Sequence, residues 1–428
     1  MSKLAVVFPG QGSQYMGMGR KWYENNLTAK QYFEEASTRL GFDLRKLCLE
    51  GDLEELTKTE NTQPAILTVS MIAFRLLLEE TGAVPYVLAG HSLGEITALT
   101  AAGGISFSDA VYLVHHRGKY MQEAVFPGMG AMSAINGLMK DQVEEICFNV
   151  SRQCGVVVPS NYNTADQIVI SGERDAVSEA EVQLTRMGAI VIPLKVSAPF
   201  HSPLMSSASD QLFEHLKSIH FKQLRYPVLS NATGELYKSE LEIASMLTKQ
   251  LTEPVLWTEC MKRMEEFGVD VVIEAGPQGV LTHFMKKSMA KQSVFAMDKE
   301  ELSTIVKSLE TKPSSNKATI IKPKTNLVTK CIAITVCTRN RNWDNDEYQK
   351  GVVEPYRKVQ KIQDELDRTG GEPTIAQMKE ALEMLSSVFE TKKVPLEERL
   401  ERYQQVFNET GTRDLFPDFD PIGASVGG

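Results

Sequence analysis

Short apolar runs alternate with longer amphipathic stretches in two parts of the chain, residues 1–126 and 197–310. The apolar runs predict short buried strands, and they lie at 4–8, 86–90, 228–230 and 271–274. The amphipathic stretches have helical spacing, and they lie at 19–40, 63–81, 95–102, 109–125, 204–220, 240–251, 257–267, 281–289 and 300–309. Strands that alternate with helices are typical of a parallel sheet covered on both faces. The pattern therefore predicts an α/β core.

The segment 127–196, between these two parts, has a different order of elements. Its predicted strands and helices follow the order β-α-β-β-α-β, with strands at 131–135, 156–159, 167–171 and 189–196 and helices at 141–154 and 175–187. That order is the split pattern of a ferredoxin-like unit. We therefore expect a small ferredoxin-like subdomain inserted into the α/β core.

The pattern changes again after residue 310. Residues 311–326 contain Lys, Pro, Ser and Asn and predict a linker. Residues 327–413 predict a mainly helical extension with one strand, in which 327–338 is rich in β-branched residues and the helices lie at 346–368, 374–392 and 396–407. Residues 414–428 contain Pro and Gly and predict a disordered tail.

The composition is typical of a globular protein, and it argues against nucleic-acid and membrane partners. Hydrophobic residues make up 42% and charged residues 24% of the 428 residues. The net charge of −9 argues against a nucleic-acid partner. No run approaches the roughly 18 apolar residues of a membrane span, so we expect a cytoplasmic protein with no membrane partner. The six cysteines form no Cys-x-x-Cys pair and no Cys/His cluster with zinc spacing, so no metal site is predicted.

The motif with the clearest chemistry is Gly90-His91-Ser92-Leu93-Gly94, which lies between a predicted strand and a predicted helix. Gly-x-Ser-x-Gly in this context is the signature of a nucleophile elbow. The two glycines let strand and helix approach closely, and the Ser92 hydroxyl then stands at a helix N-terminus that favours a developing oxyanion. The alternative is a tight turn with no chemistry.

A nucleophilic serine needs a base, and His201 is the best placed of the seven histidines. It lies in the loop 197–203 between a strand and a helix, where an α/β fold presents catalytic groups. The alternative is a loop histidine with no role. His91 adjoins Ser92, which directs its side chain away from the hydroxyl. The remaining histidines have helical surroundings and no partner motif, and they are His115, His116, His215, His220 and His283.

Several further stretches accompany these motifs, in order, over residues 1–290. They are Phe8–Gln14, Thr62–Ala65, Gly90–Glu95, Arg117-Gly118, Asn161–Asn163, Gln167–Gly172, Phe200–Ser202, Gln250-Leu251, Pro254–Trp257 and Glu274–Pro277. Together they resemble the malonyl-CoA:acyl carrier protein transacylases, and more narrowly the free-standing acyltransferases that serve modular polyketide synthases. The resemblance implies a hydrolase-like parallel-sheet core with an inserted ferredoxin-like subdomain.

The resemblance also implies how the residues act. Ser92 attacks the malonyl thioester, and His201 takes its proton. The backbone N–H groups of Gln11 and Leu93 form the oxyanion hole, and one such donor is typically worth about 3 kcal/mol. The main-chain carbonyl of Gln250 orients His201, which is the task of the aspartate in a Ser-His-Asp triad.

Substrate-binding roles follow from the same resemblance. Arg117 clamps the malonyl carboxylate, because a guanidinium binds a planar carboxylate at two points. For Arg117 alone, a solvated helix arginine is the alternative. Phe200 and Leu93 resemble the malonyl-selecting members, and Phe200 would fill the space that a 2-methyl group needs, a preference worth about 1–3 kcal/mol. His91 and Asn161 complete the expected substrate-binding set.

The expected reaction is ping-pong transfer of a malonyl group from malonyl-CoA to the phosphopantetheine thiol of acyl carrier protein, with no metal or bound cofactor. It would supply fatty acid or polyketide synthesis. The runner-up is an acyl-thioester hydrolase that clears stalled chains, although such relatives lack the arginine at 117. A catalytically silent scaffold is the third possibility, and the presence of Ser92 and His201 disfavours it.

The extension at 327–413 has no counterpart in the simple transacylase. Its apolar stripes either pack on each other or on the core, or they form a docking module for polyketide synthase modules or a carrier. Residues 312–343 carry seven Lys or Arg and no acid. One hypothesis is that these basic residues attract an acidic carrier protein, and the alternative is that they form only a solvated linker.

Overall fold

A computed structural model describes residues 3–126, 128–196, 198–310, 326–342, 344–369, 371–416 and 419. The chain divides into two compact units, Met1–Lys317 and Ala318–Gly428. In the described residues, no helix has both the length and the apolar character that crossing a membrane requires.

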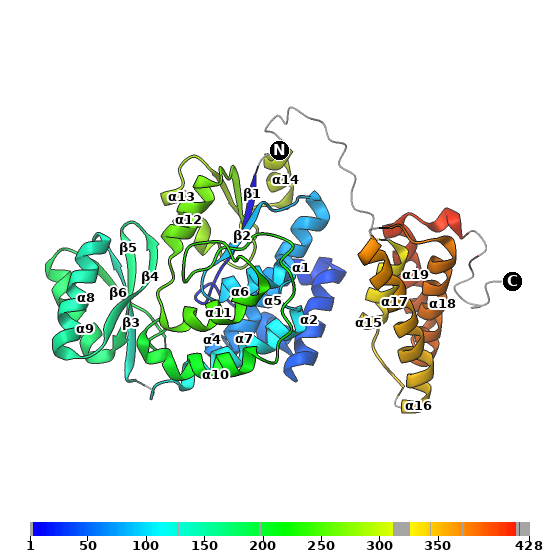
Figure 1. Ribbon diagram of the computed structural model, residues 1–428, viewed down its shortest axis with the longest axis horizontal. Coiled ribbons are helices and arrows are strands. Elements are labelled where there is room, and N and C mark those ends of the chain that lie inside the picture. The colour runs from blue at the N-terminus through cyan, green and yellow to red at the C-terminus, as the bar shows by residue number, and fades with distance from the viewer. Residues whose placement is uncertain are drawn as a thin grey trace. The chain divides into compact units, whose positions relative to one another are not determined.

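A parallel sheet lies at the centre of the first unit (Figure 1). Its four strands run in the order β2-β1-β7-β8, and they are β2 (Val87–Gly90), β1 (Leu4–Phe8), β7 (Val271–Glu274) and β8 (Ser293–Ala296). Leu4, Val6 and Phe8 face one buried cluster, whereas Ala5 and Val7 face another. Both faces of β1 are therefore covered, which confirms the predicted α/β core.

Two helices, α12 (Trp257–Glu266) and α13 (Val280–Ser288), pack on the face of Ala5 and Val7. The opposite face packs against a larger set that includes α5 (Thr59–Thr81), α6 (Leu93–Ala101) and α7 (Phe107–Glu123). Outside the inserted subdomain, the other described α-helices of this unit are α1 (Arg20–Asn25), α2 (Leu27–Leu40), α3 (Leu44–Glu50), α4 (Leu53–Thr57), α10 (Ser206–Leu216), α11 (Ile243–Thr252) and α14 (Leu302–Glu310).

Some local predictions need correction. The helix expected over 19–40 breaks at Asn26, whose side chain accepts hydrogen bonds from the N–H groups of Thr28 and Ala29 and caps α2. The strand expected at 228–230 is reduced to isolated bridges, because the chain turns back at Gly234. The short strand β8 was not predicted.

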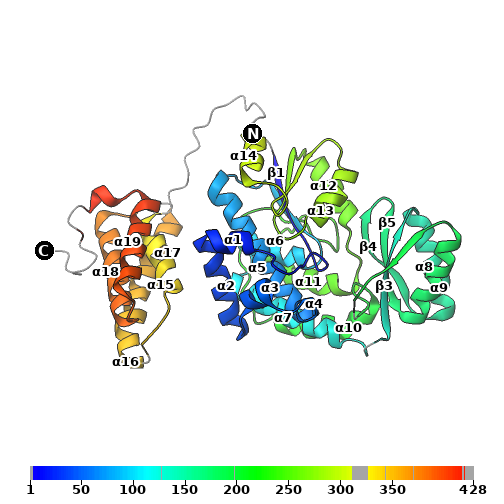
Figure 2. The same ribbon diagram turned by 180° about the vertical axis from the view of Figure 1, so that it is seen from behind.

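The inserted subdomain has the predicted ferredoxin-like order of elements. Its antiparallel sheet runs β4-β5-β3-β6, formed by β4 (Val157–Thr164), β5 (Gln167–Glu173), β3 (Gly130–Asn136) and β6 (Ile190–Pro193). The helices α8 (Lys140–Cys154) and α9 (Arg174–Arg186) lie together on one face of this sheet (Figure 2). The sheet's other face is left to border the cavity described below.

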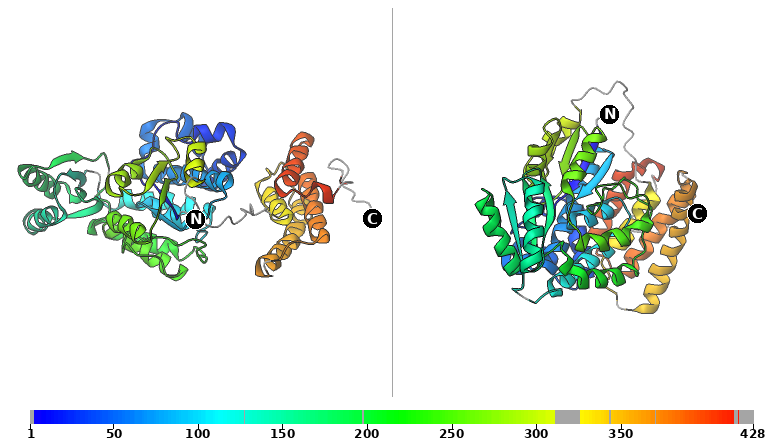
Figure 3. Two further views of the ribbon diagram at one scale, coloured as in Figure 1. Left: turned by 90° about the horizontal axis from the view of Figure 1, so that it is seen from above. Right: turned by 60° about the vertical axis from the view of Figure 1, so that its left-hand side comes forward.

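The second unit is helical (Figure 3). Its elements are α15 (Leu327–Cys337), α16 (Asn345–Tyr348), a π-helical turn (Gln349–Val353), α17 (Glu354–Thr369), α18 (Ile375–Thr391) and α19 (Leu396–Thr410). Buried residues of these helices form one separate apolar cluster. The apolar stripes therefore pack on each other, which is one of the arrangements expected from the sequence.

The strand expected at 327–338 is wrong, because these residues form α15. Leu327, Cys331 and Ile334 are buried at helical spacing, and Asn326 caps the helix by accepting from the Thr329 N–H. Burial against α17 and α18 thus outweighs the β propensity of Ile and Val.

Two predictions lie largely outside the described residues. These are the linker 311–326, of which only Asn326 is described, and the tail 414–428, of which 414–416 and 419 are described. The expectation of disorder is wrong for Phe416 and Phe419. Phe416 is buried, and the ring of Phe419 lies 4.9 Å from that of Tyr403. Burial of two aromatic rings against α19 offsets the ordering entropy that the Pro/Gly content suggested.

Candidate active site

Ser92 lies on a sharp turn between β2 and α6. Its backbone φ of 53° and ψ of −105° fall where a non-glycine residue is strained. A Cβ added to Gly90 would overlap the main chain of Gly94, and a Cβ added to Gly94 would overlap the carbonyl of Phe8. Both glycines are therefore needed for the close approach, as the elbow motif predicts.

The buried side chain of Asn231 holds this turn on both sides. The Ser92 N–H donates to Asn231 Oδ1 at 2.7 Å, and Asn231 Nδ2 donates to the carbonyl of Gly90 at 2.7 Å. These two bonds offset the strain at Ser92. Asn231 was not predicted, since no motif around it signals this role.

His201 lies beside the serine hydroxyl. Ser92 Oγ and His201 Nε2 are 2.8 Å apart, and His201 Nδ1 is 2.7 Å from the main-chain carbonyl of Gln250. Because a carbonyl only accepts, Nδ1 carries the proton and Nε2 is free to accept from the serine. Burial, followed by the charge of Arg117, lowers the pKa of His201 to about 3. The imidazole is therefore neutral at physiological pH.

Arg117 is buried in the same place, with its side chain directed from α7 to Ser92. Its Nη1 donates to Gln63 Oε1 at 2.8 Å, and its Nη2 donates to Gln250 Oε1 at 2.9 Å and to Ser92 Oγ at 3.2 Å. Its Nε has no hydrogen-bond partner among the described residues. Burial lowers its pKa to about 10, so the guanidinium stays charged at neutral pH. The alternative of a solvated helix arginine is wrong.

A fully buried carboxylate, Glu95, joins these groups. It accepts from Gln250 Nε2 at 2.5 Å, from Tyr237 Oη at 2.5 Å and from the Asn231 N–H at 3.1 Å. Glu95 was predicted only as part of the motif Gly90–Glu95, with no role of its own. A signal was present, because it is the only acid in the otherwise uncharged helix α6.

A cavity of about 460 Å³ opens onto Ser92. The predicted site residues that line it are Gln11, His91, Ser92, Leu93, Arg117, Asn161, Phe200 and His201. Gln250 does not line it and acts from behind, through His201 and Arg117. Apolar residues from both subdomains, including Met132, Val169 and Phe284, complete the wall. The cavity thus lies where the ferredoxin-like insertion meets the carboxyl ends of β1 and β2, the usual position of an α/β site.

The chain was compared with known proteins. The family model described as Acyl transferase domain matches residues 5–320. The chain belongs to this acyltransferase family. A malonyl CoA-acyl carrier protein transacylase of Bacillus subtilis is 35% identical over 401 residues, which cover 94% of this acyltransferase and 99% of the relative. Another transacylase of that name, from Bacillus subtilis strain 168, is 42% identical over 312 residues, which cover 72% of this chain and 98% of the relative.

A solved structure gives the same result for the fold. It is a malonyl-transacylase in complex with its type II polyketide synthase acyl-carrier protein, with 41% identity and a TM-score of 0.70 over 72% of this chain and 100% of that one. The two Bacillus subtilis transacylases differ in how far along this chain they match. The match over 401 of 428 residues must run into the helical unit, whereas the match over 312 residues does not require it. A transacylase therefore exists that resembles this acyltransferase well beyond the first unit.

The polar environment of the other site residues is also clear. His91 Nε2 lies 2.9 Å from Asn163 Oδ1, and burial lowers the pKa of His91, so it is a neutral hydrogen-bonding group. Asn161 Oδ1 accepts from the Ser160 hydroxyl at 2.8 Å. Leu93 is the first residue of α6, so its N–H has no partner within the helix. Asn163, which also lines the cavity, was part of the matching stretch Asn161–Asn163 but was given no role there.

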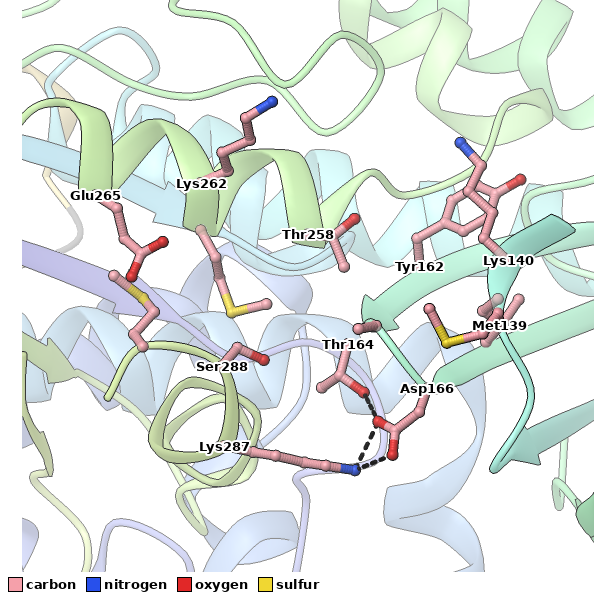
Figure 4. A pocket seen from close by; sticks show the side chains of 14 residues that line it. Met139, Lys140, Tyr162, Thr164, Asp166, Thr258, Lys262, Glu265, Lys287 and Ser288 are labelled. Carbon is pink, nitrogen blue, oxygen red and sulfur yellow. Dashed lines mark hydrogen bonds and ion pairs between the residues drawn. The ribbon is translucent and has the colours of Figure 1, made fainter. Parts of the chain in front are cut away.

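A second and larger cavity, of about 650 Å³, lies elsewhere in the acyltransferase unit, between the insertion and α12 and α13 (Figure 4). Its wall contains an ion pair, in which Lys287 Nζ donates to both carboxylate oxygens of Asp166 at 2.6 Å. None of the predicted site residues lines it. Size alone therefore does not locate the chemistry of this enzyme.

Proposed function

We propose that this acyltransferase moves a malonyl group from malonyl-CoA to the phosphopantetheine thiol of acyl carrier protein through an acyl-Ser92 intermediate. One observation carries the proposal. The Ser92 hydroxyl lies between a neutral imidazole nitrogen at 2.8 Å and a buried guanidinium nitrogen at 3.2 Å. A base and a fixed cation next to one nucleophile suit an acyl group that carries a carboxylate.

In the first half-reaction, His201 Nε2 takes the proton from Ser92 as its Oγ attacks the thioester carbonyl. The developing oxyanion is stabilised by the N–H groups of Gln11 and Leu93. The tetrahedral intermediate expels the CoA thiolate, which takes up the proton from His201. The Gln250 carbonyl keeps the imidazole in the required tautomer throughout.

Arg117 holds the free carboxylate of the acyl group. Its Nε is a buried donor without a described partner, and a carboxylate would satisfy it together with one of the terminal nitrogens. Phe200 lies next to the base and limits substituents on the carbon between the two carbonyls. His91 and Asn161 contribute polar contacts to the same acyl group.

In the second half-reaction, the carrier's phosphopantetheine thiol gives its proton to His201 and attacks the acyl ester. Ser92 recovers its proton as it leaves. Both solved and curated relatives are named as transacylases, which supports transfer over the hydrolase alternative. The expectations of no bound cofactor, of a cytoplasmic location and of a supply to fatty acid or polyketide synthesis stay predictions.

We also propose a division of labour along the chain. Residues 1–126 and 197–310 form the core, 127–196 the ferredoxin-like subdomain, 311–326 a linker and 327–413 an extension that docks polyketide synthase modules. The extension has its own apolar cluster, which supports an independently folding unit. Because these apolar residues pack on each other, the cluster itself does not need a partner protein to cover it. Deletion of residues 318–428 tests docking, and unchanged loading of every carrier offered would contradict it.

The test of the main proposal is incubation with malonyl-CoA, with and without phosphopantetheinylated carrier protein. We expect loaded carrier and little free malonate. Rapid release of malonate without loaded carrier would favour the hydrolase. Loading that persists in Ser92→Ala would contradict the mechanism.

A further inference from the structure

Glu95 is a buried carboxyl group, and each of its three neighbours is placed to donate a hydrogen bond to it. Its two oxygens accept from the Gln250 amide, the Tyr237 hydroxyl and the Asn231 N–H. An ionised carboxylate only accepts hydrogen bonds, and this set matches it. Burial raises the pKa of Glu95, and these three bonds oppose that shift. The side chain makes no contact with the cavity, so it takes no part in the chemistry itself.

The Gln250 side chain connects this carboxylate to Arg117. Its Oε1 accepts from Arg117 Nη2 at 2.9 Å, and its Nε2 donates to Glu95 at 2.5 Å. The amide dipole is therefore aligned between a cation and an anion, an arrangement in which each hydrogen bond strengthens the other. Gln250 Nε2 also donates to the Ser92 carbonyl at 3.1 Å.

We propose that Glu95 is the buried counter-ion of Arg117, acting through the Gln250 amide to weaken the hold of Arg117 on the substrate carboxylate. This inference rests on the proposed function, in which Arg117 binds that carboxylate. In the free enzyme, Glu95 offsets the cost of a buried guanidinium. In the acylated enzyme, it competes with the substrate carboxylate for the same positive charge.

The consequence for turnover follows from the two half-reactions. The malonyl carboxylate enters with CoA and must leave with the carrier. An uncompensated buried guanidinium would hold it more tightly in every state, and such uniform binding lowers KM without raising kcat. Glu95 is thus a positioning and charge-balancing residue that keeps the acyl group exchangeable.

The test compares malonyl-CoA with acetyl-CoA, which lacks the free carboxylate, by calorimetric titration of full-length proteins that carry Ser92→Ala. Glu95→Gln removes the charge and keeps the shape. Its carbonyl still accepts from Gln250 and Asn231, and its amide group donates to the Tyr237 hydroxyl, which donates to Glu95 in the parent protein. Tyr237→Phe is the matched control, because it removes one hydrogen bond and leaves the charge.

We expect Glu95→Gln to tighten malonyl-CoA binding about tenfold relative to acetyl-CoA, as for two charges about 12 Å apart at an effective dielectric constant of about 20. Tyr237→Phe should show no such selective change. Weaker malonyl-CoA binding, or an equal change for both esters, would overturn the proposal, because a merely structural role affects both alike.

Gln250→Met provides the second variant if Glu95→Gln does not fold. It breaks the amide bridge and keeps the main-chain carbonyl that holds His201, so selective tightening is again expected and its absence counts against Glu95. If the parent protein binds malonyl-CoA no better than acetyl-CoA, Arg117 is not the clamp and both proposals fail. A preserved preference that Glu95→Gln leaves unchanged overturns only the role of Glu95.

Discussion

Around Ser92, buried charged and amide side chains of the acyltransferase unit bond to one another, whereas a buried lysine of the helical unit bonds to carbonyls near a helix end. Arg117, Gln250 and Glu95 form one connected chain that reaches Ser92. In the helical unit, Lys392 Nζ donates to the carbonyls of Thr335 and Thr338, at the end of α15. In the first unit, buried polar groups hold the residues beside the nucleophile. In the second unit, a buried polar group satisfies carbonyls that the end of a helix leaves without partners.

The apolar cores support the same distinction. The helical unit has its own cluster, in which Leu385 and Phe389 are fully buried. The cluster around β1 and α5 contains residues of the first unit alone. Damage to one core should therefore leave the other intact, and the predictions below use that separation.

The largest effect is expected at the nucleophile. Ser92→Ala should lower malonyl transfer at least about 10⁴-fold, because no acyl-enzyme can form. The unfolding free energy of both units should stay nearly unchanged. Carrier loading assayed by gel shift measures the first quantity, and denaturant unfolding measures the second. Substantial residual loading would mean that transfer does not pass through Ser92.

A core mutation in the helical unit should lower stability and leave the acylation rate unchanged, which is the reverse of the result expected for Ser92→Ala. Leu385→Ala should destabilise this unit by about 2 to 5 kcal/mol, because it leaves a cavity among α15, α18 and α19. Hydrogen exchange of peptides from α15 and α18 measures the loss, and the rate of Ser92 acylation should not change. The matched control is Leu396→Ala, at a side chain that is 50% exposed, where a change within about 0.5 kcal/mol is expected. Slower acylation in Leu385→Ala would show that the two units are coupled.

Arg117→Lys should have a smaller effect that depends on the substrate. A lysine keeps the charge but cannot form a two-point bond to a carboxylate, so malonyl transfer should fall about 10- to 100-fold. Transfer of an acetyl group, which has no free carboxylate, should fall less. Steady-state kinetics with both esters measures the ratio, and equal losses would argue against a carboxylate clamp.

The smallest change is expected in the rate of Ser92 acylation as the pH is varied. The pKa of His201 is lowered to about 3 from 6.5, so protonation of the base begins only as the pH approaches the lower value. Acylation should therefore stay level from pH 8 down to about 5, where an ordinary histidine would already have lost activity. The charge of Arg117 contributes to this shift, so Arg117→Gln should move the acidic limb upward. Rapid-quench acylation in a series of buffers measures both profiles.

The sequence was informative wherever a motif imposes a backbone shape. The spacing of Gly90, Ser92 and Gly94 predicted the elbow because only glycine permits the contacts found at both positions. The order of strands and helices predicted both sheets. The residues that brace the site were harder to find, since Asn231 and Tyr237 lie in loops far from Ser92 in sequence and meet Glu95 only in the fold.

The error at residues 327–338 has a different origin. The stretch contains Ile332, Ile334 and Val336, whose β-branched side chains favour strands in isolation. Burial of one helical face in a shared core, together with an N-cap at Asn326, decides the outcome instead. Propensity predicts poorly where tertiary packing supplies most of the free energy.

The most direct test of the central claim is mass spectrometry of the intact protein after brief mixing with malonyl-CoA, followed by peptide mapping. We expect one malonyl group per chain, located on Ser92, and its disappearance when phosphopantetheinylated carrier protein is added. An unmodified protein, or a malonyl group on another residue, would contradict it.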